Sequence, residues 1–236
     1  MSIYNIAGLN VSCSFTYAEM RRRSEKYLSD AGTADISVDV PENVFREFAD
    51  QYKDLPADEV EIILSGSDFY EKLLDFDGFM LHSSAIEVDG KAYLFSAPSG
   101  TGKSTHTEQW VKLLGDRVSY INDDKPAIRI INDVIYACGT PWSGKNDISK
   151  NVCVPLQGIC MLERSAENRI CRMSADEVIF ELISQTLRVA DEKRMGRLME
   201  LMDTVLERIP VWKLGCNIST QAAELSYKTM SSAEVR

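Results

Sequence analysis

The most constraining feature of this sequence is a glycine-rich loop that follows a short apolar run and precedes a stretch with helical spacing. The apolar run covers residues 92–95, and the loop covers residues 97–105. A strand, a glycine loop and a helix in this order let backbone N–H groups converge on a phosphate, and the helix N-terminus adds partial positive charge. Lys103 adds a point charge, and the Ser104 hydroxyl suits Mg²⁺. The residues expected to contact phosphate are Pro98, Ser99, Gly100, Thr101, Gly102, Lys103, Ser104 and Thr105.

The first position of this loop departs from the usual G-x-x-x-x-G-K-[ST] (Walker A) pattern. Ala97 stands there in place of glycine. Because alanine resists positive φ, the turn at this position must be one that a Cβ tolerates. The alternative is a glycine turn that holds no ligand, but the flanking strand and helix favour a nucleotide-binding loop.

Length and composition are those of an ordinary globular chain. The sequence has 236 residues, of which 44% are hydrophobic and 26% are charged, enough for one substantial core. The formal net charge of −10 disfavours general binding to nucleic acid or to an anionic membrane. The sequence has neither a membrane-spanning apolar stretch nor the pattern of a signal peptide. We therefore expect a cytoplasmic protein.

The cysteines and a run of arginines have plain interpretations. The six cysteines form no C-x-x-C pair, so the sequence indicates neither a zinc site nor a dithiol redox motif. We expect most of them to be small buried hydrophobes. Arg21, Arg22 and Arg23 form a local basic cluster, which we interpret as the solvated face of a helix.

The apolar pattern predicts one continuous α/β domain with a mixed sheet. Residues 1–76 are expected to form a small N-terminal α/β segment packed on the core, and residues 77–236 a nucleotide-binding catalytic domain with C-terminal helices. Residues 60–64 look strand-like and residues 69–74 helix-like, so the type of that segment stays open. The other elements expected in the N-terminal segment are a strand at residues 3–7, a helix at residues 19–28, a strand at residues 36–40 and a helix that begins near Pro41.

The pattern is clearer from residue 80 onward. Residues 80–88 and 91–97 predict a β-hairpin, because Asp89 and Gly90 readily supply the positive φ of a two-residue turn. The helix after the glycine loop should run from Lys103 to Leu114 and stop at Gly115. The later elements expected are a strand at residues 118–121, a hairpin of residues 127–131 and 134–137, a buried strand at residues 158–162, and helices at residues 175–189 and 192–208.

Two adjacent acids, Asp123 and Asp124, follow the strand expected at residues 118–121. Functional groups of α/β proteins gather at the C-terminal ends of strands. Phosphoryl transfer needs a carboxylate that holds Mg²⁺ and often a second one that accepts the proton of the attacking hydroxyl. Beside a phosphate-binding loop, we therefore interpret this pair as catalytic rather than as a simple acidic turn.

Three further positions carry candidate chemistry. His82 lies on the strand that enters the hairpin, where a histidine is either a core residue or a catalyst. His106 lies in the first helical turn after the loop, where it either faces solvent or reaches a substrate. Lys145 follows Trp142 and Gly144 in a segment that fits a lid, whose lysine compensates charge on a transferred phosphoryl group. A buried Trp142 that anchors a structural turn is the alternative.

Together these motifs resemble the C-terminal catalytic domain of HPr kinase/phosphorylase, which has the phosphoenolpyruvate-carboxykinase-like (PEPCK-like) P-loop fold. The resemblance is carried by residues 80–85, the hairpin, residues 98–105 and residues 122–124, in the same order and spacing. It is firm over about residues 78–126 and weaker towards the end of the chain. Residues 138–145 replace the glutamate- and arginine-bearing segment of true HPr kinases, so the resemblance does not identify HPr as the substrate.

The resemblance implies roles for individual residues. It places His82 in the active site, residues 98–105 at the phosphates of ATP, and Ser104 at Mg²⁺. The two aspartates are implied as base and metal ligand; we assign Asp123 as the base and Asp124 as the ligand. Short kinases of this kind act on free serine or on a serine of a protein or peptide.

The leading hypothesis is therefore an ATP- and Mg²⁺-dependent kinase that transfers the γ-phosphoryl group to a serine-type hydroxyl. Its partners would be a nucleotide and a serine-bearing protein, peptide or small molecule, and a homo-oligomer is compatible with the sequence. A nucleotide-binding regulator without catalysis is one alternative. A PEP carboxykinase is another, but its chains are usually longer and we cannot place its metal-binding lysine and histidine. The choice among ATP, GTP and pyrophosphate stays open.

Overall fold

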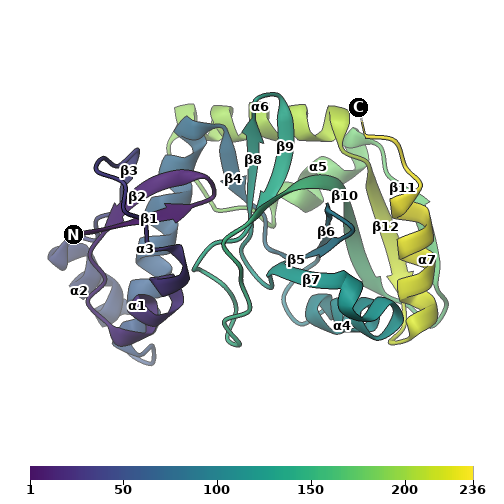
Figure 1. The fold of residues 1–236 in the computed structure, drawn as a ribbon, viewed down its shortest axis with the longest axis horizontal. Helices are drawn as coiled ribbons and strands as arrows, with labels where there is room; N and C mark the ends of the chain where they lie inside the picture. The colour runs from purple at the N-terminus through teal and green to yellow at the C-terminus, as the bar shows by residue number, and fades with distance from the viewer. Residues whose placement is uncertain (236) are drawn as a thin grey trace.

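A computed structural model describes residues 1–235, which form a small N-terminal layer beside a larger mixed sheet with helices (Figure 1). In the N-terminal layer, β1 pairs antiparallel with β2, and β2 pairs parallel with β3. Alternate residues of β2 are buried, as a strand with one covered face requires. The elements of this layer are β1 (Ser2–Ile6), β2 (Leu9–Cys13), α1 (Ala18–Ser24), the 3₁₀ turn η1 (Glu25–Tyr27), β3 (Ile36–Ser37), α2 (Glu42–Gln51) and α3 (Ala57–Leu73).

Helix α3 resolves the segment whose type the sequence left open. Residues 60–64 are rich in branched apolar side chains, which suggested a strand, yet they lie in one helix that continues to Leu73. Ser65, Phe69 and Leu73 are buried at intervals of four residues, so packing against the layer overrides the local strand preference. The strand expected at residues 36–40 is also shorter, because only Ile36 and Ser37 pair with β2.

The larger sheet has nine strands, with the order β4-β8-β9-β10-β6-β5-β7 and with β12 and β11 joined beside β10. The long strand β10 pairs antiparallel with β9 at its start and parallel with both β6 and β12 further along. It therefore connects an antiparallel part of the sheet to a mixed part. The strands are β4 (Gly78–Met80), β5 (Ser83–Val88), β6 (Lys91–Ser96), β7 (Val118–Asn122), β8 (Ala127–Ile131), β9 (Val134–Cys138), β10 (Cys153–Arg164), β11 (Arg169–Arg172) and β12 (Val211–Cys216).

Both predicted hairpins are confirmed. Strands β5 and β6 pair around Asp89 and Gly90, and strands β8 and β9 pair around Asn132 and Asp133. All four turn residues have positive φ, as tight two-residue hairpin turns require. Residues 80–82 are the exception within the first hairpin. Met80 belongs to the separate strand β4, which pairs with β8, and β5 begins only at Ser83, so His82 precedes the strand on which it was expected.

The helices of the larger domain agree with the sequence in part. Helix α4 runs from Lys103 to Leu114, and α6 spans residues 192–208, as predicted. Helix α5 ends at Ile183, six residues earlier than expected; beyond it, the Gln185 carbonyl accepts the His82 N–H at 2.7 Å. Strand β12 and helix α7 were not predicted. The remaining elements are α4 (Lys103–Leu114), η2 (Leu74–Phe76), η3 (Gly115–Arg117), α5 (Ala175–Ile183), α6 (Glu192–Arg208) and α7 (Thr220–Ser231).

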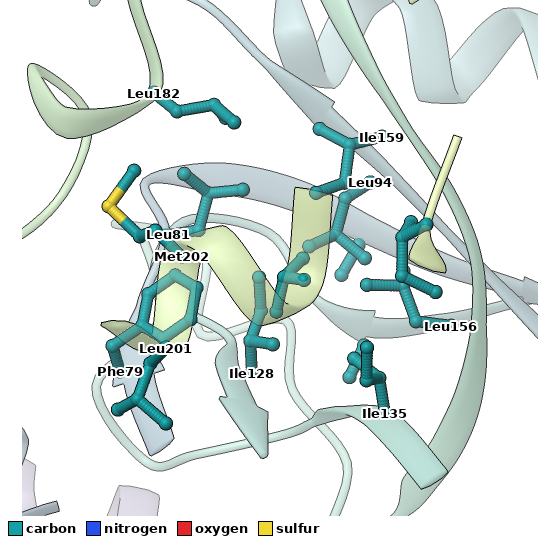
Figure 2. Packing of buried hydrophobic residues seen from close by; sticks show 14 of the residues in the cluster. Phe79, Leu81, Leu94, Ile128, Ile135, Leu156, Ile159, Leu182, Leu201 and Met202 are labelled. Carbon is teal, nitrogen blue, oxygen red and sulfur yellow. The ribbon is translucent and has the colours of Figure 1, made fainter. Parts of the chain in front are cut away.

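Three apolar clusters hold these elements together. One cluster lies between the sheet and helices α5 and α6, with Leu94, Ile128 and Met202 among its members (Figure 2). A second packs α4 and α7 against the other side of the mixed strands. The third joins the N-terminal layer to the sheet, because Trp142 is buried together with residues of β1, β2 and α3. The layer therefore lies in direct contact with a loop of the larger domain.

The cysteines do not all behave as isolated hydrophobes. Cys138 at the end of β9 lies opposite Cys153 at the start of β10, and the two form a disulfide. This pairing corrects the expectation for these two residues, and it closes the loop of residues 139–152 at its base. Cys13 and Cys160 are buried as expected, whereas Cys171 is exposed. Within residues 1–235, we find no helix that is both long and apolar enough to cross a membrane.

Candidate active site

The strand register brings the predicted site residues to one edge of the sheet. Strands β6 and β7 both pair antiparallel with β5, so they run in the same direction on either side of it. Ser83 at the start of β5 lies opposite Ser96 at the end of β6, and Ala85 lies opposite Asn122 at the end of β7. The segments that precede β5 and follow β6 and β7 therefore leave the sheet at the same edge. These segments carry His82, the glycine loop, and Asp123 with Asp124.

The glycine loop turns sharply between β6 and α4. Gly100 has φ of +78° and Gly102 has φ of +123°, conformations that side-chain-bearing residues rarely adopt. Ala97 does not adopt positive φ, so the turn there tolerates a Cβ, as the sequence required. Pro98, Ser99 and Gly100 are exposed, and the next two residues are half-buried. Because Gly102 has no side chain to cap α4, the first-turn N–H groups of the helix stay available to an anion.

Lys103 folds back over this loop. Its Nζ donates a hydrogen bond to the Ala97 carbonyl at 3.0 Å, and the residue is only 8% exposed. Burial lowers the pKa of Lys103, and the negative charge of Asp124 opposes that shift. Ser104, the next residue, is exposed, and Thr105 is half-buried. The loop therefore presents an ammonium and a free hydroxyl on adjacent residues.

Arg164 holds the outer side of the glycine loop, and no motif or pattern in the sequence indicated this role. Its Nε donates to the Thr101 carbonyl at 3.2 Å, and its Nη2 donates to the Gly100 carbonyl. Arg164 is the last residue of β10, which extends two residues beyond the predicted strand end. With both carbonyls turned towards this guanidinium, the loop is braced from the neighbouring strand.

Asp123 faces the loop that follows β9. Its Oδ1 accepts the Gly144 N–H at 2.9 Å, and its own N–H donates to the Ile148 carbonyl at 3.1 Å. Burial raises the pKa of the Asp123 carboxyl, with the Asp124 charge acting in the same direction and the Gly144 hydrogen bond opposing it. A carboxylate with a raised pKa is a better proton acceptor than one at the surface.

Asp124 has a different environment. Its Oδ1 lies 3.0 Å from His82 Nε2, and its Oδ2 pairs with Lys125. Burial raises the pKa of this carboxyl, but the His82 hydrogen bond and the Lys125 charge outweigh burial, so the net shift is well below the usual range. The Asn122 side chain fixes the turn, because its Oδ1 accepts the N–H groups of Asp124 and Lys125. The two adjacent aspartates are thus held with opposite pKa shifts.

The His82 ring lies between the side chains of Gln185 and Asp124 and is not a plain core residue. Its Nδ1 lies 3.2 Å from Gln185 Oε1, while its Nε2 meets Asp124. Ser96 Oγ donates to the His82 carbonyl at 2.8 Å. The ring is therefore oriented from both sides and fixes the direction of the Asp124 carboxylate. Gln185 lies in the segment that the sequence predicted to be helical.

The loop of residues 139–151 lies between the aspartates and the N-terminal layer. Trp142 is buried, stacks on Phe69 with 4.6 Å between ring centroids, and donates from Nε1 to Ser65 Oγ. The anchoring role considered for this tryptophan is therefore the one found. Lys145 is exposed, two residues after the buried Ser143.

Arg23 fastens this loop from helix α1. Its Nη1 donates to the carbonyls of Ser143 at 2.9 Å and Gly144 at 3.2 Å, and its Nε pairs with Glu19. Arg23 is 6% exposed, so the interpretation of the arginine cluster as a solvated face is wrong for this residue. Arg21 and Arg22 are exposed, as expected.

His106 neither faces solvent nor approaches the aspartate side of the site. It is buried against Phe95, and its Nε2 accepts the indole N–H of Trp110 at 3.2 Å and lies 3.1 Å from Ser226 Oγ. Burial lowers its pKa to about 4. A ring nitrogen that accepts a hydrogen bond carries no proton, so this environment favours the neutral imidazole.

A cavity of about 710 Å³ lies beside the glycine loop. It is bounded by residues 100–102 of the loop, by α4, by residues 162–166 and by residues 216–218. Strands β10 and β12 run parallel to β6, so their C-terminal ends reach the same edge as the loop. The volume lies within the range of about 300–1,000 Å³ that is typical of small-molecule sites.

Comparisons with known proteins add a similarity of fold. The chain matches no protein-family model and no curated protein sequence. Among solved structures, it is similar to the HPr(Ser) kinase/phosphatase from Coxiella burnetii, with a TM-score of 0.33 and 10% sequence identity. The match covers 64% of this chain and 92% of that chain. A similarity of this size assigns neither a fold family nor a function, so the roles of individual residues rest on the geometry described above.

Proposed function

We propose that this protein is an ATP- and Mg²⁺-dependent kinase that transfers the γ-phosphoryl group to a serine-type hydroxyl. One observation carries the proposal: the register of β5, β6 and β7 brings the glycine loop, His82 and the two aspartates to one sheet edge. Phosphoryl transfer depends mainly on positioning and charge stabilisation, and it requires a phosphate cradle and carboxylates together.

The nucleotide is bound in two parts. Its phosphates lie against the loop of residues 97–105, where the first-turn N–H groups of α4 and the Lys103 ammonium attract anions. The nucleoside occupies the adjoining cavity, whose wall includes the apolar side chains of Leu162 and Ile218. A phosphate chain that starts in this cavity and crosses the loop ends on the side of the aspartates.

Ser104 and Asp124 suit the magnesium ion. Ser104 is exposed in the first turn of α4, and the lowered pKa of Asp124 keeps its carboxylate ionised at neutral pH. Mg²⁺ prefers oxygen ligands and is usually held by one or two protein groups together with substrate phosphates. When bound, the ion neutralises charge on the phosphates. His82 Nε2 lies 3.0 Å from Asp124 Oδ1 and orients the carboxylate.

Asp123 serves as the base. Of the two aspartates it is the one with a raised pKa, and the hydrogen bond from Gly144 fixes its orientation. It accepts the proton of the attacking hydroxyl while Lys103 remains on the phosphate side. Lys145, exposed one residue beyond Gly144, supplies positive charge near the transferred group.

The test is a transfer assay with γ-labelled ATP, Mg²⁺ and a panel of free serine, serine peptides and HPr. We expect label on at least one acceptor, and Asp123→Asn should lower kcat by about 10²- to 10⁴-fold. Nucleotide affinity, measured by titration with a fluorescent ATP analogue, should stay within about threefold of wild type. Asp116→Asn, which changes an exposed aspartate after α4, is the matched control and should leave both quantities unchanged.

The outcome separates an enzyme from a nucleotide-binding regulator. A folded protein that binds nucleotide but labels no acceptor contradicts the kinase proposal. If Asp123→Asn also responds to partners as the wild type does, the protein acts through nucleotide binding itself and not through phosphoryl transfer. Loss of nucleotide binding in Asp123→Asn would contradict the separation of roles between the loop and the base.

A further inference from the structure

Exposed cations gather on a surface formed by helix α1, turn η1 and the loop of residues 139–151. Arg22 Nη1 lies 2.9 Å from Asp147 of the loop, and Lys26 Nζ lies 3.7 Å from the same carboxylate. A hydrogen bond also joins the two segments, because the Asn151 side chain donates from Nδ2 to the Lys26 carbonyl at 3.4 Å. We name this face the basic surface; its cations are Arg22, Lys26, Lys145 and Lys150.

The basic surface begins next to the proposed base. Gly144 donates its N–H to Asp123 Oδ1 at 2.9 Å, and Lys145 is the next residue along the loop. At the far side, the Tyr27 hydroxyl donates to the Lys150 carbonyl at 3.3 Å, which fixes the end of the loop against η1. Exposed cations therefore lie both on the loop that contacts Asp123 and on the helix and turn packed against that loop. Of these, Lys150 donates from Nζ to Ser119 Oγ at 2.6 Å.

The local charge is opposite to that of the molecule as a whole. The full chain has a formal net charge of −10, yet helix α1, turn η1 and the loop of residues 139–151 together carry six arginines and lysines and three carboxylates. Asp147 pairs with Arg22 and Lys26, Glu19 pairs with Arg22 and Arg23, and Glu25 is the third carboxylate. Within residues 1–235, Lys145 and Lys150 form no ion pair. A positive surface on an acidic protein selects an anionic partner by charge complementarity.

We propose that the phosphoryl acceptor is a polypeptide segment whose serine is flanked by acidic residues, and that this segment docks on the basic surface. The inference rests on the proposed kinase function and names its substrate class. Free serine offers a single carboxylate and needs only one cation, whereas this surface presents cations on two separate segments. An acidic segment reaches several of them while its serine hydroxyl lies at Asp123.

The experiment measures peptide binding separately from phosphoryl transfer. Fluorescein-labelled peptides with one central serine, flanked by glutamates, by glutamines or by lysines, are titrated with the full chain in the presence of Mg²⁺ and a non-hydrolysable ATP analogue. We expect the glutamate peptide to bind at least about tenfold more tightly than the other two at low salt. Raising the salt concentration should weaken that preference, because exposed charges are screened.

Charge-reversal variants locate the binding face. The double variant Lys26→Glu with Lys150→Glu should weaken glutamate-peptide binding about tenfold and leave nucleotide affinity unchanged. Lys112→Glu, an exposed lysine on α4 away from the basic surface, is the matched control and should change neither. Circular dichroism and thermal melting check that each variant is folded.

The outcomes distinguish the two proposals. Equal binding of the three peptides, no binding of any peptide, or equal effects of the double variant and Lys112→Glu overturns the acidic-acceptor inference. If the glutamate peptide binds as expected but receives no label, the kinase proposal fails and the docking surface stands. If label is transferred without preference for acidic peptides, the kinase proposal stands and the docking surface fails.

Discussion

The two loops that form the candidate site are each fastened by an arginine that donates to main-chain carbonyls, yet the two arginines come from different places. Arg164 holds Gly100 and Thr101 of the glycine loop from the end of strand β10, within the same sheet. Arg23 holds Ser143 and Gly144 from helix α1 of the N-terminal layer, 120 residues away in the sequence. The proposed nucleotide side of the site is therefore built within the sheet, whereas the proposed acceptor side depends on the N-terminal layer.

The two arginines also differ in how deeply they are buried. The Arg23 side chain is 7% exposed and has a second partner in Glu19. Arg164 lies at an exposed position and bonds loop carbonyls that are open to solvent. The Ser143 carbonyl that Arg23 binds is buried and cannot replace a lost hydrogen bond with one to water, so the proposed acceptor side should be more sensitive to the loss of its arginine.

The largest expected effect follows from Arg23→Ala. We expect the free energy of unfolding to fall by about 3 kcal/mol, because the substitution empties a buried site and leaves two carbonyls without their charged donor. Urea unfolding followed by tryptophan fluorescence measures it. Arg22→Ala is the control: that side chain is 57% exposed, and its surface ion pairs should contribute less than about 1 kcal/mol. Equal losses in the two variants would show that Arg23 does not fasten the loop.

The next effect is a loss of folding stability at low pH that arises from His106, on the glycine-loop side of the site. Burial lowers the pKa of His106 to about 4, from an ordinary value of 6.5. Folded His106 therefore stays neutral while the unfolded chain binds a proton, so stability that is complete above pH 6.5 is lost progressively towards pH 4. The loss should reach about 3 kcal/mol. Urea unfolding at a series of pH values measures it, with His106→Gln as the reference that lacks this titration.

On the proposed acceptor side, the stability contributed by Glu19 should be lost at a lower pH than that of His106. Hydrogen bonds from Arg22 and Arg23 lower the pKa of Glu19 to about 2, from an ordinary value of 4.5. Its contribution is therefore present above pH 4.5 and is lost as the pH falls towards 2. If wild type and His106→Gln lose the same free energy of unfolding between pH 6.5 and pH 4.5, His106 on helix α4 is not the group that titrates there.

The smallest effect is expected for Arg164→Ala. Removing the two hydrogen bonds to the glycine loop should raise the nucleotide Kd about tenfold, because the loop carbonyls lose their brace and the phosphate-binding amides lose their fixed direction. Thermal stability should change little. Arg169→Ala removes another exposed arginine, on strand β11, and should leave the Kd unchanged. A similar change in both variants would reduce the role of Arg164 to general surface charge.

The nucleotide side was largely predictable because its signals are local. The glycine loop, both hairpins and helix α4 are each encoded by a few consecutive residues, such as Asp89 and Gly90 at a tight turn. Placing Asp123 and Asp124 at the edge near the loop needed only the expectation that strand ends gather functional groups. Whether these residues perform the proposed chemistry remains a prediction.

The acceptor side was not predictable because its contacts join distant parts of the chain. Arg23 had the pattern of a surface helix, and its burial is decided by the loop that packs on it. The disulfide between Cys138 and Cys153 depends on the register of β9 and β10. Strand-like residues at the start of α3 became helical because the layer covers one face of that helix.

The most direct test of the central claim, that the glycine loop and the two aspartates form one nucleotide site, is a crystal structure with Mg²⁺ and a non-hydrolysable ATP analogue. We expect the phosphates on the backbone N–H groups of residues 99–105, the adenine ring in the cavity beside Leu162, and the terminal phosphate facing Asp123. A nucleotide bound elsewhere, or a terminal phosphate directed away from both aspartates, would contradict it.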